Sequence, residues 1–279
     1  MVKYGVLVIS HGSRNEDWVA LVDEAVADLN KEGILTGIMK RKALTALHDE
    51  FPICSAFLEI VAGRLIQDGI NCLQEQGVTD MIVVPLFISS GSTHIDEIKY
   101  ALGVIPEPNV ATDMVPFSIE ARVHLCSPID DDADIAEIIY EKIKDLSIEP
   151  NREIVLLVGH GSKEKGFHLR WRRGLERLAD RIKQLGGFHY VDIAMLLPDQ
   201  TKRKMEQWAV LKPGYPVVVA PLFLSEGYFT NEVIPKRLRE YAYRYNGRTM
   251  LPHPLISRWM EKQIRFQLRM LEGNGMMGE

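Results

Sequence analysis

The chain has 279 residues, of which 46% are hydrophobic and 25% are charged, with a formal net charge of −5. This composition is typical of a globular protein, and the length suffices for one large domain or two modest ones. The acidic balance argues against a general nucleic-acid binder, which needs a basic face. No apolar run approaches the ~20 residues that cross a bilayer, and no signal-peptide pattern precedes the first strand. We therefore expect a cytoplasmic protein that binds neither nucleic acid nor membrane.

The three cysteines are scattered along the chain. Cys54, Cys72 and Cys126 show no C-x-x-C spacing. This pattern indicates neither a disulfide framework nor a cysteine-based metal site.

Apolar runs alternate with segments of helical periodicity through the first half of the chain. This alternation predicts strands at 4–9, 51–58, 81–86 and 121–126, and helices at 15–30, at 60–76, up to about 102, and from the acidic residues 130–132 to about 146. The run at 81–86 has the β-branched content of a strand buried on both faces. Residues 33–49 fit no pattern and are interpreted as an inserted loop or short helix. Residues 147–152 are interpreted as a linker.

The same order of motifs then begins again. VISHGSR after the first strand returns as LVGHGSK, and IVVPLFISSGSTH returns as VVVAPLFLSEGYFT. The first copy is longer, mainly before Glu59, which places the insertion within residues 33–49. We interpret the pattern as an internal duplication with halves at 1–148 and 151–279. Strands that alternate with helices predict an α/β fold, in which each half is a parallel sheet flanked by helices.

Three side chains follow three predicted strands of the first half: His11, Glu59 and His94. Because ligands bind beyond the carboxyl ends of parallel strands, we expect these side chains to lie close together. Two imidazoles and a carboxylate suit a divalent ion such as Fe²⁺, Co²⁺ or Ni²⁺ with open coordination positions. The same groups could also transfer protons. The plainer alternative is that His11 and its repeat counterpart His160 lie near helix N-termini and are held by backbone hydrogen bonds, with Glu59 a solvated surface residue.

Other sites with known sequence patterns fit less well. The glycine-flanked segment 11–14 lacks the spacing of both common phosphate loops. No G-x-S-x-G elbow is present, so an α/β-hydrolase would lack its nucleophile. The arginines between 170 and 181 accompany an apolar helical stripe, which favours a solvated helix face.

The motifs HGSR, FLE and VVPLF-x-x-x-G-x-x-H, in this order, resemble the CbiX/SirB family of class II tetrapyrrole chelatases. The resemblance spans the chain, and it implies two fused chelatase-like halves. It also implies ATP-independent insertion of Co²⁺ or Fe²⁺ into sirohydrochlorin, a lyase-type step on the route to cobalamin or sirohaem. The alternative is a chelatase-derived protein that binds metal or tetrapyrrole without catalysis.

The resemblance also implies roles for individual residues. His11 and His94 would hold the incoming metal and Glu59 would assist, so these three residues form the predicted catalytic and metal site. The residues predicted to contact the macrocycle follow the same strands: Ser13, Arg14, Ser89, Ser90, Gly91, Ser92 and Thr93. No cofactor is expected beyond the substrate metal ion, Co²⁺ or Fe²⁺, with Ni²⁺ also compatible. The expected partners are a tetrapyrrole and a divalent metal, and the chain is expected to be a monomer.

The second half is expected to be degenerate. Aligning the repeat places His160 on His11, Leu197 on Glu59 and Thr230 on His94. Leucine cannot ligate a metal, and a threonine hydroxyl is a poor ligand for these ions beside imidazole. We therefore predict that only the first half performs chemistry.

Overall fold

The computed structural model describes residues 2–31 and 51–275. The insertion predicted within residues 33–49 lies outside the described residues. None of the described helices combines the length and apolar character needed to span a membrane.

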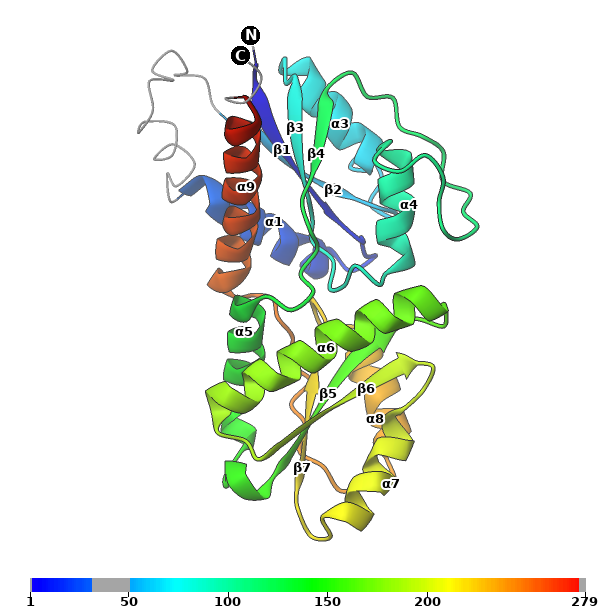
Figure 1. Cartoon of the computed structure of the whole chain (residues 1–279), viewed down its shortest axis with the longest axis vertical. Coiled ribbons are helices and arrows are strands. Elements are labelled where there is room, and N and C mark those ends of the chain that lie inside the picture. Colours follow the sequence, from blue (N-terminus) through cyan, green and yellow to red (C-terminus); the bar gives the residue numbers. More distant parts are fainter. Residues whose placement is uncertain (1, 32–50, 276–279) are drawn as a thin grey trace. The chain divides into compact units, whose positions relative to one another are not determined.

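The described segments alternate strands and helices in chain order (Figure 1). The strands are β1 (Tyr4–Ser10), β2 (Ile53–Phe57), β3 (Asp80–Pro85), β4 (Arg122–Leu125), β5 (Ile154–Gly161), β6 (Tyr190–Leu197) and β7 (Val217–Pro221). The α-helices are α1 (Glu16–Lys31), α3 (Ile66–Glu75), α4 (Thr93–Ala101), α5 (Ala133–Ile143), α6 (Lys165–Gly186), α7 (Thr201–Leu211), α8 (Ile234–Leu238) and α9 (Pro254–Gly275). The short turns are 3₁₀ at Lys144–Leu146 and Pro150–Arg152, and π-helical at Phe229–Val233.

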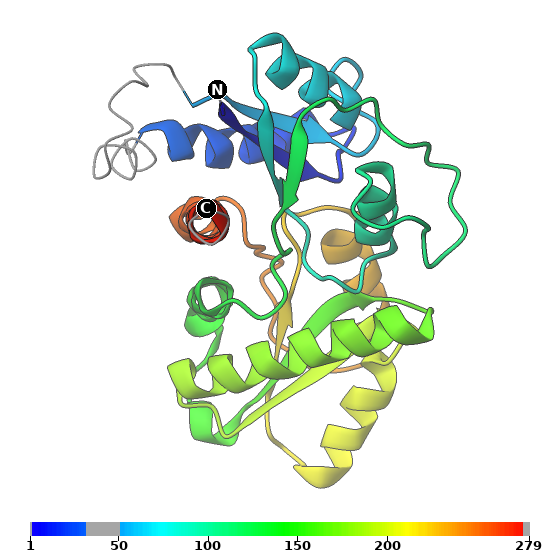
Figure 2. The same cartoon turned by 45° about the horizontal axis from the view of Figure 1, so that its top comes forward.

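The first sheet has the order β2-β1-β3-β4 among the described strands, and all its pairings are parallel. Leu7 and Ile9 of β1 pack with α3 and α4 on one face. Helices α1 and α9 lie on the opposite face, where α9 packs against α1 and β3 (Figure 2). All six residues of β3 are buried, which confirms the prediction of a strand covered on both faces.

The second sheet repeats this pattern with the order β6-β5-β7, again parallel in the described residues. One face of the sheet packs against Met205 of α7 and Ile234 of α8. Helix α6 covers the other face with α5 beside it. The first sheet has β4 beside β3. At the equivalent position beside β7, the described part of the second sheet has an isolated bridge between Arg244 and Val218. The predicted α/β fold with two similar halves is therefore confirmed.

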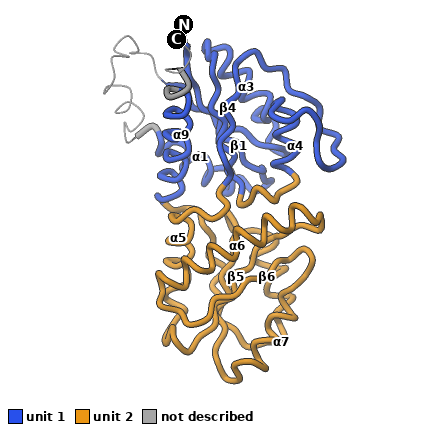
Figure 3. The backbone as a smooth tube through the Cα atoms, in the orientation of Figure 1, with its two compact units in different colours: residues 1–87, 94–128, 254–279 blue, residues 88–93, 129–253 orange. Residues whose placement is uncertain are grey.

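The compact units of the structure follow different boundaries from the sequence halves (Figure 3). The first unit contains residues 1–87, 94–128 and 254–279, and the second contains residues 88–93 and 129–253. Helix α5 follows β4 in the chain but packs against α6, whereas α9 follows the second sheet and packs against α1. Each sheet is thus covered by the last helix of the other half of the chain.

The helix predicted at 60–76 begins later, at Ile66. Ile60 has a φ of 74°, in the left-handed region that β-branched residues avoid, and Gly63 also has positive φ. A helix cannot run through such residues, so 58–65 forms a loop. The carboxylate of Asp68 then accepts the Leu65 N–H at 2.8 Å and satisfies the start of α3.

A buried carboxylate stabilises the first sheet at the amino end of its strands. Asp80, at the start of β3, accepts hydrogen bonds from His124 at 2.9 Å and from Arg122 at 3.0 Å. Burial alone would raise the pKa of Asp80, but these partners and Thr79 outweigh it, and the net pKa is lowered. His124, for which the sequence indicated no role, is thereby explained as a structural residue.

We predict that Asp80→Asn lowers the free energy of unfolding at pH 7 by about 1–3 kcal/mol, because buried hydrogen bonds to a charged group are lost. The lowered pKa means that the Asp80 contribution is present above the unfolded-state pKa of ~3.9 and is lost as pH falls through the lower folded-state value. Denaturant unfolding at pH 7 and through the acid range measures this. A variant with the wild-type stability at pH 7 would contradict the assignment.

Candidate active site

Backbone hydrogen bonds that continue past the carboxyl end of β1 bring two predicted site residues, His11 and Glu59, together. Leu58 N–H donates to the Ser10 carbonyl at 2.8 Å, and Glu59 N–H donates to the His11 carbonyl at 3.1 Å. On the other side of β1, Leu86 N–H donates to the Ile9 carbonyl at 2.7 Å. The chain segments after β1, β2 and β3 therefore leave the same edge of the sheet side by side.

Gly12 permits the close approach between the first two segments. Its φ is +100°, and a Cβ atom added there would lie 2.1 Å from the Glu59 carbonyl oxygen. Only glycine combines this backbone conformation with the absence of a side chain. The HGS motif is thus explained locally by the need to keep Glu59 next to His11.

The His11 ring lies close to each of the other two predicted site residues. Its Nε2 is 3.6 Å from Glu59 Oε1, and its ring centroid is 4.9 Å from that of His94, with 76° between the ring planes. Its Nδ1 lies 3.2 Å from the Gly12 carbonyl oxygen. Because a carbonyl oxygen can only accept, this contact assigns the hydrogen of the neutral ring to Nδ1 and leaves the lone pair on Nε2.

His94, in the first turn of α4, has the same tautomer for a related reason. Its Nδ1 lies 3.0 Å from Glu97 Oε2, and a carboxylate only accepts. Thr112 Oγ1 donates to the other oxygen of Glu97 at 3.2 Å. Sequence analysis assigned no role to Glu97, although its i,i+3 spacing from His94 on a helix was a usable signal. A carboxylate that holds the distal nitrogen of a histidine is the usual support for a metal ligand.

The three predicted ligands are accessible rather than fully assembled. The side chains of His11, Glu59 and His94 are 42%, 54% and 38% exposed, so an ion from solution can reach them. Across residues 2–31 and 51–275, no three His, Cys, Asp or Glu side chains are arranged as a ready metal site. The structure places His11 beside each of the other two, and their joint ligation of an ion stays a prediction.

An ion pair fixes the loop that carries Glu59. Arg64 donates to both carboxylate oxygens of Asp23 on α1, at 2.8 and 2.6 Å, and Ser55 also donates to that carboxylate. Partial burial would raise the pKa of Asp23, but hydrogen bonds from Arg64 and Ser55 outweigh it and the net pKa is lowered. The Arg64 guanidinium also lies 4.8 Å from the centre of the Phe57 ring. The pair therefore ties the end of the 58–65 loop to α1.

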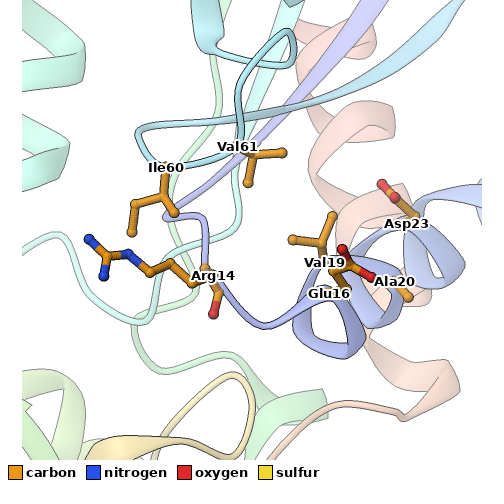
Figure 4. A pocket seen from close by; sticks show the side chains of 8 residues that line it. Arg14, Glu16, Val19, Ala20, Asp23, Ile60 and Val61 are labelled. Atoms are coloured by element: carbon orange, nitrogen blue, oxygen red, sulfur yellow. The ribbon is translucent and has the colours of Figure 1, made fainter.

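A shallow pocket of about 440 Å³ adjoins the histidine loop (Figure 4). Ser13 and Arg14 contribute to its wall from the loop after β1, and Ile60 and Val61 contribute from the loop after β2. The remaining lining residues belong to α1: Glu16, Val19, Ala20 and Asp23. Two of the predicted macrocycle contacts, Ser13 and Arg14, thus line a cavity beside the predicted metal site.

The loop at residues 89–93 is packed more tightly than expected. Gly91 was predicted to contact the macrocycle, and in the structure a Cβ on Gly91 would lie 2.4 Å from the Phe167 carbonyl oxygen of α6. Ser89 is buried, and Ser90 donates from its backbone N–H to Asp130 at 2.8 Å. Ser92 and Thr93 are half-buried. The small residues are therefore explained by close packing on α6, and the loop leads directly into His94.

A comparison with known families decides the identity of the chain. The CbiX family model matches residues 5–146 and matches again over residues 154–266. The chain belongs to the CbiX family. This confirms the resemblance seen in the sequence, and the two matched segments agree with two similar halves.

Individual relatives are more distant. A sirohydrochlorin ferrochelatase from Priestia megaterium is 26% identical over 233 residues, which cover 82% of this chain and 76% of that protein. A probable sirohydrochlorin cobaltochelatase from Halobacterium salinarum is 24% identical over 188 residues, which cover 60% of this chain and 59% of that protein. The structure of SirB from Bacillus subtilis with Fe³⁺ is similar with a TM-score of 0.70 at 19% identity, covering 98% of both chains. At this identity the structural likeness concerns the fold.

In the second CbiX half, the backbone at the carboxyl ends of β5 and β6 repeats the conformation seen after β1 and β2 in the first half. Gly161 has a φ of +81°, and a Cβ there would lie 2.4 Å from the Leu197 carbonyl oxygen. His160 Nδ1 lies 3.1 Å from the Gly161 carbonyl oxygen, as His11 Nδ1 does from that of Gly12. The structure therefore places His160 and Leu197 where His11 and Glu59 stand in the first half.

The counterpart of His94 differs from the sequence alignment. The ring 4.9 Å from His160 belongs to Phe229, at an interplanar angle of 88°, whereas Thr230 is buried. The Thr230 hydroxyl is within hydrogen-bonding distance of both the N–H and the carbonyl of Gly227, at 2.9 and 3.0 Å. This local bonding and the π-helical turn at Phe229–Val233 change which side chain faces His160. The aromatic ring that faces His160 therefore comes from Phe229, the residue before the one aligned with His94.

We predict that Gly91→Ala destabilises the protein by about 1–3 kcal/mol, because the added methyl meets the backbone of α6 in a packed region. Gly166, near the start of α6, is the matched control, since a Cβ there meets nothing within 4 Å. Gly166→Ala should leave stability unchanged or slightly raised. Thermal unfolding of both variants measures the difference, and equal melting temperatures would contradict the packing described for residues 89–93.

Proposed function

We propose that this protein inserts Co²⁺ or Fe²⁺ into sirohydrochlorin or a closely related tetrapyrrole without ATP. Membership of the CbiX family and the names of the two curated relatives support the reaction class. The assignment to named residues is supported by the His11–His94 pair. The two rings lie 4.9 Å apart, and both Nδ1 atoms contact oxygen acceptors. The product would serve cobalamin or sirohaem formation.

The metal is a substrate in this proposal and must be held only transiently. The Nε2 atoms of His11 and His94 supply two neutral donors, and Glu59 supplies a carboxylate beside the first. Such a set suits Fe²⁺, Co²⁺ and Ni²⁺ and leaves positions for water and for pyrrole nitrogens. Exposed side chains exchange ligands more readily than a closed site, so the ion can pass to the macrocycle.

Insertion also requires two pyrrole protons to leave the macrocycle. Glu59, with its Oε1 3.6 Å from His11 Nε2, can accept a proton once the metal is no longer bound to the carboxylate. Either imidazole can do the same after releasing the ion. Arg14 in the adjoining pocket offers a cation for the peripheral carboxylates of the substrate, and Ser13 offers a hydroxyl. Residues 89–93 contribute by presenting His94.

We also propose that this chemistry belongs to the half at 1–148 and that the half at 151–279 serves as scaffold. The equivalent edge of the second sheet offers one imidazole beside the aliphatic Leu197 and the ring of Phe229. Neither Leu197 nor Phe229 donates a lone pair to a metal, whereas Glu59 and His94 both can. One metal and one tetrapyrrole per chain follow from this proposal. We separately propose that the chain acts as a monomer.

We predict that His11→Ala and His94→Ala each lower the rate of Co²⁺ insertion into sirohydrochlorin by about 10²-fold or more, because a metal ligand and proton acceptor is lost. The absorbance change of the macrocycle measures the rate. Thermal melts should stay near wild type, since both side chains are more than a third exposed. Wild-type protein no faster than the protein-free control would exclude the enzyme and leave a binding protein. Near-full turnover in either variant would show that the metal site lies elsewhere.

We predict that His160→Ala keeps turnover within a few-fold of wild type, because Leu197 and Phe229 stand beside His160 where Glu59 and His94 stand beside His11. This variant is the matched control for His11→Ala, since both histidines occupy the same backbone position and both contact the next carbonyl oxygen. Equal losses in the two variants, or two Co²⁺ ions bound per chain at comparable affinity, would contradict the asymmetry.

A further inference from the structure

Two cysteines that are distant in sequence meet in the first unit. Cys54 lies on β2 and Cys72 lies on α3, which packs against β2, and their Sγ atoms are 3.3 Å apart. A disulfide bond brings the two sulfur atoms to about 2.05 Å, and the packing of α3 on β2 already holds them in van der Waals contact. The sequence spacing indicated no disulfide, because the contact arises from the packing of α3 on the sheet.

The two thiols differ in their surroundings. Cys72 is exposed, and Gln76 donates from its amide to the Cys72 sulfur at 3.4 Å. Cys54 is half-buried and packs against the core of the first unit. Burial, followed by the hydrogen bond and charge of Cys72, raises the pKa of the Cys54 thiol to about 12. Cys72 is therefore the thiol that meets reagents from solution, with Cys54 directly behind it.

We propose that Cys54 and Cys72 form a reversible intramolecular disulfide with low-molecular-weight disulfides as the oxidant. In the first step the Cys72 thiolate attacks one sulfur of the reagent, and one small thiolate leaves. In the second step Cys54 loses its proton and attacks the Cys72 sulfur, and the second small thiolate leaves. The protein loses two protons and two electrons, and the reagent is reduced to two thiols.

The second step is favoured by the first. Two of the three contributions that raise the pKa of Cys54 come from the hydrogen bond and the charge of Cys72. Both disappear once Cys72 is converted to a neutral mixed disulfide, so deprotonation of Cys54 becomes easier at the moment when its attack is required. Because the two sulfurs are already in contact, the mixed disulfide is resolved within the chain.

The bond would close a covalent ring over residues 54–72. This ring contains the 58–65 loop, with Glu59 at one end and Arg64, the partner of Asp23, at the other. Oxidation would therefore restrain the segment that presents the Glu59 carboxylate. The disulfide itself does not depend on the proposed function, and its test needs no substrate.

Native wild-type protein treated with oxidised glutathione tests the proposal by intact mass and peptide mapping. We expect a monomer that has lost two alkylatable thiols, carries no glutathione, contains a linked Cys54–Cys72 peptide, and recovers three thiols with dithiothreitol. Cys126 is buried, so Cys126→Ala should form the same link and serves as the matched control.

The resolving step is tested separately with Cys54→Ser. This variant should accumulate a stable glutathione adduct on Cys72. Cys72→Ser should form no disulfide with Cys54 and should gain glutathione more slowly than Cys54→Ser. A wild-type protein that keeps three free thiols under these conditions would overturn the proposal. A wild-type glutathione adduct as stable as that of Cys54→Ser would also overturn it, because it would show that the neighbouring thiol does not attack.

Discussion

Parallel pairing on both sides of β1 is the constraint on which the rest of the site depends. Since β1 has β2 on one side and β3 on the other, the segments after all three strands emerge at one edge of the sheet. Two backbone hydrogen bonds continue the β1–β2 pairing past the strand ends and bring Glu59 beside His11. Gly12 makes the approach sterically possible. The positions of His11 and Glu59 are therefore set by backbone geometry before any ligand is present.

The duplicated half shows that this backbone geometry does not by itself make a metal site. His160 and Gly161 repeat the conformation of His11 and Gly12 in the second sheet. The neighbouring positions carry Leu197 and Phe229, and the Phe229 ring also stacks on Phe223. The same frame thus supports two donor groups around one histidine and apolar packing around the other. These few side chains are the basis of the proposed division of labour between the halves.

Much of this arrangement could be predicted from the sequence because it is local or repeated. Buried strands such as β3 have a clear apolar pattern, and repetition of the HGS and PLF motifs revealed the duplication. The exchange of α5 and α9 could not be predicted, because helical periodicity does not say which sheet a helix will cover. The loop before α3 was missed because Ile60 adopts a left-handed conformation that its side chain disfavours. The contacts of Phe229 and Cys72 depend on packing between elements, which residue spacing does not report. The Glu97–His94 contact lies within α4 and was missed although its i,i+3 spacing was a usable signal.

The central claim is that His11 and His94 together hold the incoming ion at the edge of the first sheet. X-ray absorption spectroscopy of the Co²⁺-loaded protein tests it most directly, because imidazole ligands give a characteristic scattering pattern that can be counted. The account predicts two imidazoles per cobalt in wild-type protein and one in His11→Ala or in His94→Ala, with His160→Ala unchanged. A cobalt site whose imidazole count is the same in wild type, His11→Ala and His94→Ala would contradict it.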